Sequence, residues 1–292
     1  TWIGKSMALY FLSGTSDVSQ LIEKLLSVLD RPLFRNLLAT GRWLREAPRS
    51  MPWRGQVMAR LVELLRKTGQ PLGLRAQALG ALILSEDQGI LVLLRQLLEE
   101  SDHDLLQLAA LGSGFMRDLK AIDLLTPLLN SPSPILRRSA CLALVNIGTS
   151  PAMDHVASAL LHGDENLRRY AAEALANHSQ EGHAMLKEGA GMKDDLLVRR
   201  SVVFGLSRIP ERWAREIINH LETEDDQWVV RNAAMEANEN LQRLNPHIPQ
   251  RLPPPTESPW IIAFAGKNGL GVSPEKPPID LNPNMDDQPR YN

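Results

Sequence analysis

A unit of 31 residues repeats along the middle of this chain, and this regularity constrains the fold more than any other feature. Each repeat contains an apolar residue followed by arginine, with small or apolar residues at fixed offsets after it, as in residues 136–144. The arginines of this series are Arg75, Arg137, Arg168, Arg199 and, one residue late, Arg231. Leu106 occupies the one skipped position. Repeats of about 20–50 residues predict stacked units, because one such unit cannot bury its apolar face alone.

A second series has the same period and carries an acid or a serine. Its members are Asp102, Ser133, Asp164, Asp195 and Asp226. Each precedes a stretch with apolar residues at helical spacing, so its oxygen is placed to accept hydrogen bonds from the free N–H groups of a helix start. The arginine that follows one turn later lies near its own acid or near that of the neighbouring unit. We therefore predict helix caps joined by a ladder of ion pairs.

Composition favours helices, because Leu and Ala dominate while aromatic residues make up only 5%. The formal net charge of −2 gives no bulk attraction to nucleic acid or to an anionic membrane. No apolar run reaches the roughly 18 residues that a membrane-spanning helix needs. The single cysteine, Cys141, lies between Ala140 and Leu142 and is expected to be apolar filler, which fits a reducing, cytoplasmic compartment.

Each unit therefore resembles a pair of antiparallel helices, and the chain is predicted to be an all-α protein. We expect an α-solenoid, a right-handed superhelix of about seven helix hairpins spanning residues 71–245 as its repeat region. Residues 1–70 lack the 31-residue period and are predicted to form diverged hairpins that cap the array, with helices at 18–29, 32–46 and 53–67. Glycines at 182, 189 and 191 predict that the first helix of that unit is short or broken.

Beyond residue 244 the sequence changes, since eleven of the 20 prolines lie there. Residues 246–292 are predicted to be a Pro/Gly-rich extended tail, largely irregular or disordered. The apolar stretch 260–265 inside it is expected to dock on the last hairpin, with a partner-binding peptide as the alternative.

The repeat unit resembles the HEAT family, in particular the variety named for phycobilisome lyases. The similarity rests on an Asp, then apolar-Arg-x-x-Ala-x-x-Ala-Leu, then a glycine-ended turn such as Ile147-Gly148, and it covers about residues 85–245. It implies a helical repeat fold in a protein that binds partners. The pattern of residues 16–75 also resembles the helical region of bacterial NACHT-type signalling ATPases. That second resemblance implies a sensor arm whose partner is a nucleotide-binding domain upstream in the same polypeptide.

Three motifs could suggest chemistry, and none of them carries it. Gly4-Lys5-Ser6 matches only the end of a phosphate-binding loop, and the glycine-rich residues 266–271 lack a strand-to-helix setting. His178, Glu181 and His183 lack a further fixed metal ligand, so we expect a surface turn there. No nucleophile with an adjacent base is evident, and we therefore expect no enzyme activity, no cofactor and no metal.

A second row of arginines directly follows the ladder row, at Arg138, Arg169 and Arg200, with Arg208 near its end. These residues point about 100° away from the ladder around the helix. The resemblance to HEAT proteins implies that they line a concave groove, spaced for an extended acidic peptide or a phosphate backbone. The alternative is a solvated face on which the arginines pair with Glu173, Glu236 and their neighbours.

The sequence thus favours a non-catalytic scaffold that binds a protein or an acidic peptide, without nucleic acid or membrane. Two alternatives stay open. One is a HEAT-like DNA-repair glycosylase or nucleic-acid binder, for which Trp213, Trp228, Asp225 and Asp226 are the only candidate residues. The other is a chaperone similar to bilin lyases, which the resemblance to that repeat variety implies.

Overall fold

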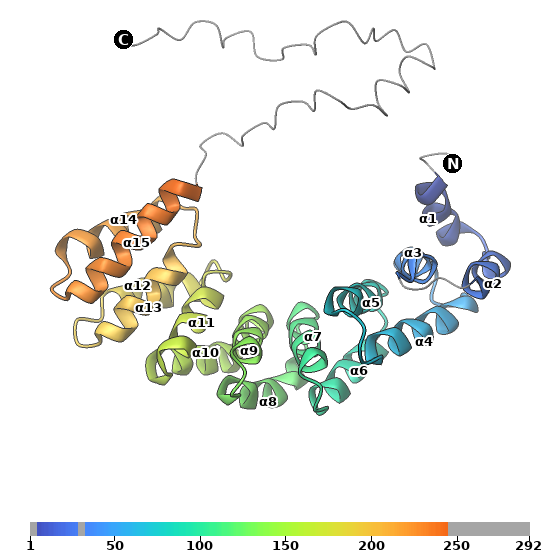
Figure 1. Ribbon diagram of the computed structural model, residues 1–292, viewed down its shortest axis with the longest axis horizontal. Coiled ribbons are helices and arrows are strands. Elements are labelled where there is room, and N and C mark those ends of the chain that lie inside the picture. Colours follow the sequence, from blue (N-terminus) through green and yellow to red (C-terminus); the bar gives the residue numbers. More distant parts are fainter. Residues whose placement is uncertain (1–4, 29–32, 245–292) are drawn as a thin grey trace, which may run out of the picture. The chain divides into compact units, whose positions relative to one another are not determined.

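The computed structural model describes residues 5–28 and 33–244, and all regular structure within these ranges is helical. It contains fifteen α-helices and two short 3-10 segments, arranged as successive antiparallel hairpins (Figure 1). The predicted all-α solenoid is therefore confirmed. The chain divides into two units, residues 1–239 and 240–292, and the described part of the second is the last turn of α15. The predicted tail, its apolar stretch 260–265 and the glycine-rich residues 266–271 lie outside the described residues.

Six pairs of helical segments follow one another from residue 53 onward. They are α4 (Trp53–Arg66) with α5 (Leu72–Leu84), α6 (Gly89–Leu98) with α7 (His103–Phe115), the segment Leu119–Asn130 with α9 (Pro134–Ile147), α10 (Ser150–His162) with α11 (Glu165–Leu175), α12 (Glu181–Ala190) with α13 (Leu196–Leu206), and α14 (Arg212–Glu224) with α15 (Trp228–Leu244).

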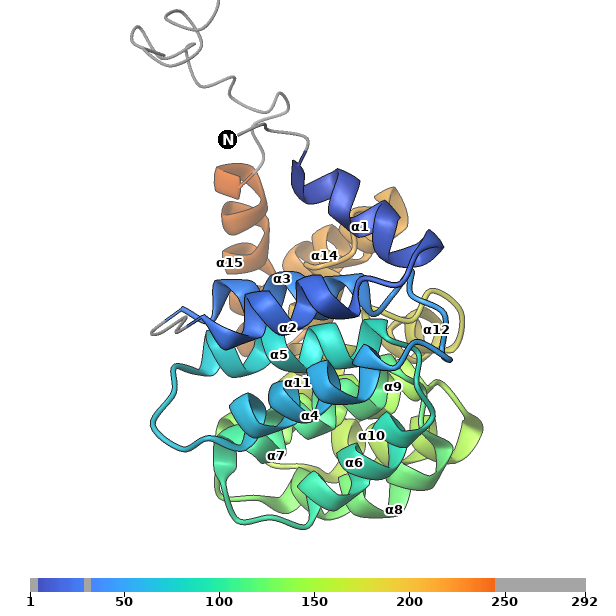
Figure 2. The same cartoon turned by 90° about the vertical axis from the view of Figure 1, so that its right-hand side faces the viewer.

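The second helices of these hairpins form one layer of the first unit, in which α5, α7, α9, α11 and α13 each pack against the next. The first helices form the other layer, where α10 packs against α12 and α12 against α14. Figure 2 shows the same layers from the side. The core lies between the layers and repeats with the sequence, since Leu82, Leu144, Leu175 and Leu206 are all fully buried. Burial of such an apolar stripe in every unit supplies the main stabilisation of the array.

The N-terminal region has three helices, α1 (Lys5–Thr15), α2 (Ser19–Ser27) and α3 (Arg35–Trp43), before the regular pairs begin. Helices α2, α3 and α4 match the predicted segments within a few residues, whereas α1 was not predicted. The buried Arg54 of α4 donates hydrogen bonds to the carbonyls of Leu44, Ala47 and Ser85. This guanidinium satisfies carbonyls at the ends of α3 and α5, which the helices themselves leave unpaired.

The irregular first helix is not the one that the sequence indicated. Helix α12 is continuous over ten residues despite its glycines. Gly182 serves a close approach instead, because a Cβ there would lie 2.2 Å from the carbonyl oxygen of Leu175. The broken helix lies two hairpins of sequence earlier and comprises η1 (Leu119–Ala121), α8 (Ile122–Leu125) and η2 (Thr126–Asn130). Pro127 explains this break, because it has no N–H for an α-helical hydrogen bond and its ring crowds the preceding turn.

The ends of three successive second helices share one backbone conformation. Glu86, Arg117 and Gly148 are 31 residues apart, and each has a positive φ, of 54°, 52° and 69°. This left-handed residue ends the helix and turns the chain toward the next unit. Only the third position has glycine, which adopts the conformation without steric cost.

Candidate partner-binding surface

The predicted ladder joins successive repeats. In each rung an arginine binds the acid that lies 27 residues further along the chain. Arg75 Nη2 is 2.8 Å from Asp102 Oδ2, and Arg168 Nη1 is 3.1 Å from Asp195 Oδ2. Arg137 Nη2 donates to Asp164 Oδ1 in the same way, at 2.5 Å. The sequence left open whether the arginine pairs with its own acid or with that of its neighbour, and the structure places it on the acid of the following repeat.

The same carboxylates cap helices. Asp102 accepts from the N–H groups of residues 104 and 105, Asp164 from that of residue 167, and Asp195 from those of residues 197 and 198. The hydrogen bond from Arg137, followed by that from the backbone of residue 167, lowers the pKa of the Asp164 carboxyl from its ordinary value of 3.8. For Asp195, burial opposes the charged form, but hydrogen bonds from the residue 198 N–H and from Arg168 outweigh it and lower the pKa.

One rung is absent, and both of its members are replaced together. Leu106 stands where the arginine would be, and Ser133 stands 27 residues later where its acid would be. The predicted cap at Ser133 is wrong, because the serine side chain accepts no hydrogen bond from the helix. Pro134, the first residue of α9, also removes one of the N–H groups that a cap could satisfy. An unpaired buried arginine would be costly here, and leucine avoids that cost.

The last rung is shifted by one residue. Arg199 reaches Asp226 at 3.0 Å, but its buried partner is Asp225, which accepts from Nε at 2.7 Å and from Nη2 at 3.1 Å. Asp225, rather than the predicted Asp226, also accepts from the N–H of Gln227 at the start of α15. Arg231 donates to the backbone carbonyl of Asp225. The arginine that comes one residue late in the sequence thus belongs to an altered helix start.

The second arginine row converges on a single carboxylate. Arg138 Nη2 and Arg208 Nη2 lie 3.3 Å and 3.1 Å from Glu173 Oε2, while Arg169 Nε lies 3.1 Å from Oε1. Glu173 belongs to α11 and its side chain is 7% exposed. The three arginine side chains are 49%, 48% and 47% exposed. We call this group the Glu173 cluster; it consists of Glu173, Arg138, Arg169 and Arg208.

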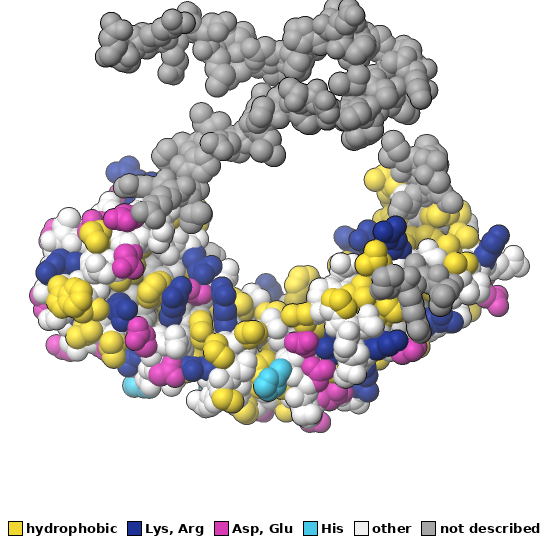
Figure 3. Space-filling view, viewed as in Figure 1, with side chains coloured by type: hydrophobic (Ala, Val, Ile, Leu, Met, Phe, Trp, Pro, Cys, Tyr) yellow, Lys and Arg dark blue, Asp and Glu magenta, His cyan; other side chains and the backbone are white. Residues whose placement is uncertain are grey.

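Three elements position the Glu173 cluster. Arg138 lies on α9, Arg169 lies on α11 one turn before Glu173, and Arg208 follows the end of α13. The guanidinium of Arg169 also lies over the ring of Phe204, 4.3 Å from its centroid, which fixes its plane. Figure 3 shows Lys and Arg side chains gathered over this part of the second-helix layer.

The equally spaced row that the sequence suggested is not formed, because Arg200 does not join the other three. Its Nη1 lies 2.7 Å from Glu165 Oε1, so its charge is neutralised by a separate exposed acid. Arg208, which lies outside the 31-residue register of the row, takes the third place beside Glu173. Pairing with Glu173 was the alternative to a groove, and the geometry combines the two: the arginines are paired and still half exposed.

The residues considered for other chemistry are committed elsewhere. His183 is buried and its Nε2 lies 3.1 Å from the carbonyl oxygen of Ala176, while Trp213 contacts His183 and Lys187. Asp225 binds Arg199, and Trp228 is exposed. Burial raises the pKa of the Cys141 thiol to about 12, which keeps it protonated near neutral pH. No group of three or more His, Cys, Asp or Glu residues suited to a metal ion occurs in residues 5–28 and 33–244.

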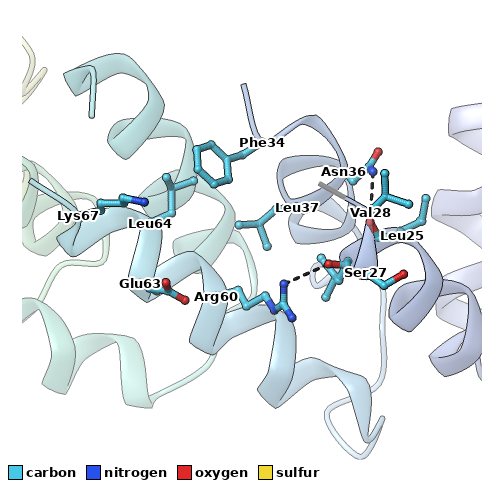
Figure 4. Close-up of a pocket in the computed structure, with 11 residues that line it drawn as sticks. Leu25, Ser27, Val28, Phe34, Asn36, Leu37, Arg60, Glu63, Leu64 and Lys67 are labelled. Carbon is cyan, nitrogen blue, oxygen red and sulfur yellow. Dashed lines mark hydrogen bonds between the residues drawn. The ribbon is translucent and has the colours of Figure 1, made fainter. Parts of the chain in front are cut away.

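A cavity of about 240 Å³ lies between α2, α3 and α4. Arg60 reaches from α4 to the carbonyl of Leu26, and Asn36 of α3 donates to that of Leu25 (Figure 4). The cavity is lined by Val28 and Phe34 on either side of residues 29–32, which lie outside the described residues. It receives no functional assignment for this reason. No helix in the described part of the chain is both long and apolar enough to cross a bilayer.

Comparison with known proteins supports the repeat assignment. The family described as HEAT repeats matches residues 58–144 and 90–176. This match does not distinguish the phycobilisome-lyase variety and does not address the NACHT-type resemblance, so both stay expectations. No curated protein sequence matches the chain.

Among solved structures, human deoxyhypusine hydroxylase in complex with glycerol is similar at 18% sequence identity with a TM-score of 0.31. The similarity covers 82% of this chain and 99% of that protein, and at this level it carries no argument about function. The helix pairing, the 31-residue period and the family match agree on one conclusion: the chain contains HEAT repeats arranged as an α-solenoid.

Proposed function

We propose that this protein is a non-catalytic scaffold that binds an acidic segment of a partner protein on its second-helix layer. The observation that carries the proposal is the Glu173 cluster, in which three arginines are held half exposed by one buried carboxylate. Surface arginines usually lose conformational entropy when they bind a ligand. Here Glu173 has already restricted three of them, so less entropy remains to be lost on binding.

The stacking of repeats supports a binding role as well. The cluster draws on α9, α11 and the end of α13, which belong to three successive repeats. A partner that contacts all three arginines would therefore extend across several units of the layer, as an extended peptide does. Acidic side chains fit this surface because arginine forms bidentate hydrogen bonds with carboxylates.

Fluorescence anisotropy tests this function directly. The probe is a fluorescein-labelled peptide of alternating glycine and glutamate, titrated with the full chain at low salt. We expect binding that weakens as salt is added. The double variant Arg138→Glu with Arg208→Glu should abolish binding.

Arg212→Glu provides the matched control. Arg212 is 92% exposed and pairs with Glu216 on its own helix, so reversing its charge changes net charge without touching the cluster. Equal losses in the two variants would show that the peptide responds only to net charge, and the proposed surface would then be wrong. Circular dichroism of each variant establishes that it is folded.

A further inference from the structure

The Glu173 cluster holds more positive charge than its carboxylate can neutralise. Three guanidiniums surround one carboxylate, which leaves a surplus of two positive charges. Within residues 5–28 and 33–244 these three arginines form ion pairs with Glu173 alone. Two of them, Arg138 and Arg208, approach the same oxygen, so they are close neighbours that repel each other. One cation would satisfy Glu173, and the other two are available to an incoming anion.

The arginines also keep most of their hydrogen-bond donors. Each contacts Glu173 through one nitrogen: Nη2 of Arg138, Nη2 of Arg208 and Nε of Arg169. A guanidinium carries five N–H donors in a fixed plane. Since about half of each side chain is exposed, several donors from three different repeats remain for one ligand that approaches from solvent.

We infer that the Glu173 cluster is a binding site for a phosphorylated serine or threonine of the partner protein. The inference rests on the proposed function and specifies its ligand. A phosphorylated side chain carries a charge of about −1.5 to −2 near neutral pH and three strong acceptor oxygens. It therefore matches both the surplus charge and the converging donors. A single aspartate or glutamate brings one charge and leaves half of the surplus uncompensated.

The charges around the cluster favour one phosphoryl group over a nucleic-acid backbone. A nucleic acid gains affinity by contacting many phosphates along its length. The arginines that would extend the site are already paired, Arg200 with Glu165 and Arg212 with Glu216. The positive surplus is thus confined to one point of the layer, which suits a single dianion on a peptide.

Three peptides that differ at one position test the inference. Each has the alternating glycine-glutamate background, labelled with fluorescein, and carries phosphoserine, glutamate or serine at its centre. We expect the phosphoserine peptide to bind about tenfold more tightly than the glutamate peptide at fixed salt, because it adds charge and acceptors at one point. Arg138→Gln and Arg208→Gln should each remove most of this preference, whereas Arg212→Gln should leave it unchanged. Each single variant still leaves Glu173 two arginine partners, which protects the fold.

The outcomes separate the two levels of the proposal. Equal affinity for the phosphoserine and glutamate peptides would overturn the phosphoryl site and leave the acidic-peptide scaffold standing. Tighter binding of a single-stranded DNA oligonucleotide than of the phosphoserine peptide would replace the inference with nucleic-acid binding. The absence of binding to all three peptides would overturn both the site and the proposed function.

Discussion

Arg168 binds Asp195 across a repeat boundary, with its Nη1 at 3.3 Å from Oδ1 and 3.1 Å from Oδ2 of the carboxylate. The same carboxylate accepts hydrogen bonds from the N–H groups of Leu197 and Val198 at the start of α13. One side chain therefore caps a helix and holds the preceding repeat. Any change that weakens it should weaken the helix start and the contact between repeats together.

Acid should destabilise the array through these caps. The pKa of the Asp164 carboxyl is lowered from 3.8, first by the hydrogen bond from Arg137 and then by the helix N–H. A carboxyl with a lowered pKa in the folded state contributes stability above 3.8, and this contribution is lost as pH falls below that value. We expect Asp164→Asn to lose about 1 kcal/mol at neutral pH and to show a shallower fall in Tm between about pH 5 and about pH 3.

Thermal melts followed by circular dichroism at each pH measure this effect. Asp154→Asn is the control, because Asp154 is an exposed residue on α10. If Asp164→Asn and Asp154→Asn follow the wild-type pH dependence equally, the rung contributes nothing to stability.

A glycine should stabilise the chain where a left-handed residue is not glycine. Arg117 is exposed and has a φ of 52°, at the position that Gly148 occupies one repeat later. A residue with a side chain pays about 1–2 kcal/mol for this conformation, and glycine returns part of that gain through its freedom in the unfolded chain. We expect Arg117→Gly to raise the free energy of unfolding by about 0.5–1 kcal/mol.

Arg117→Ala separates the backbone effect from the loss of the arginine side chain, since alanine has the same strain at positive φ. Denaturant unfolding should show a gain for Arg117→Gly alone. A gain of equal size for Arg117→Ala would mean that the side chain, and not the backbone, is the cause.

The missing rung can be restored. Leu106→Arg alone should be destabilising because it buries an unpaired charge, and Ser133→Asp alone should have a small effect. Together they should form the pair seen at Arg75 and Asp102, with a coupling free energy of about 1 kcal/mol or more. A double-mutant cycle in denaturant measures this coupling, and an additive result would show that the position cannot accept a rung.

Close contact between second helices makes some glycines irreplaceable. A Cβ at Gly205 would lie 2.4 Å from the carbonyl oxygen of Ala172, so Gly205→Ala should push α13 away from α11 and cost about 1–3 kcal/mol. Gly112 is a matched comparison, because its Cβ would meet the flexible end of Leu94 at 2.8 Å. Gly112→Ala should therefore cost clearly less. Equal losses, measured by thermal or denaturant unfolding, would contradict this explanation.

The sequence could predict whatever depends on the period. The hairpins and most of the caps follow from residues that recur every 31 positions, because each repeat solves the same packing problem. The direction of the ladder could not be read, since Asp164 is close enough in the sequence to Arg168 and, in a stack, also close to Arg137. The break before α9 had a visible signal in Pro127, but the apolar spacing around it still resembled a regular helix.

The Glu173 cluster could be predicted only in part. Arg138 and Arg169 were found by their spacing, and Glu173 was considered as one of their partners. The third arginine, Arg208, lies after a helix end, where the period no longer determines position. Long side chains that start far apart can meet at one carboxylate, and no pattern in a single sequence shows this convergence.

Each rung runs from the arginine of one repeat to the acid of the next. A repeat therefore offers a guanidinium to its successor and a carboxylate to its predecessor. A tandem copy of the 31 residues, inserted between two such units, would find a complementary charge on both sides and leave no buried ion unmatched. The spacing of this one ion pair thus makes the array extensible by gene duplication, with each new unit already fitted to its neighbours.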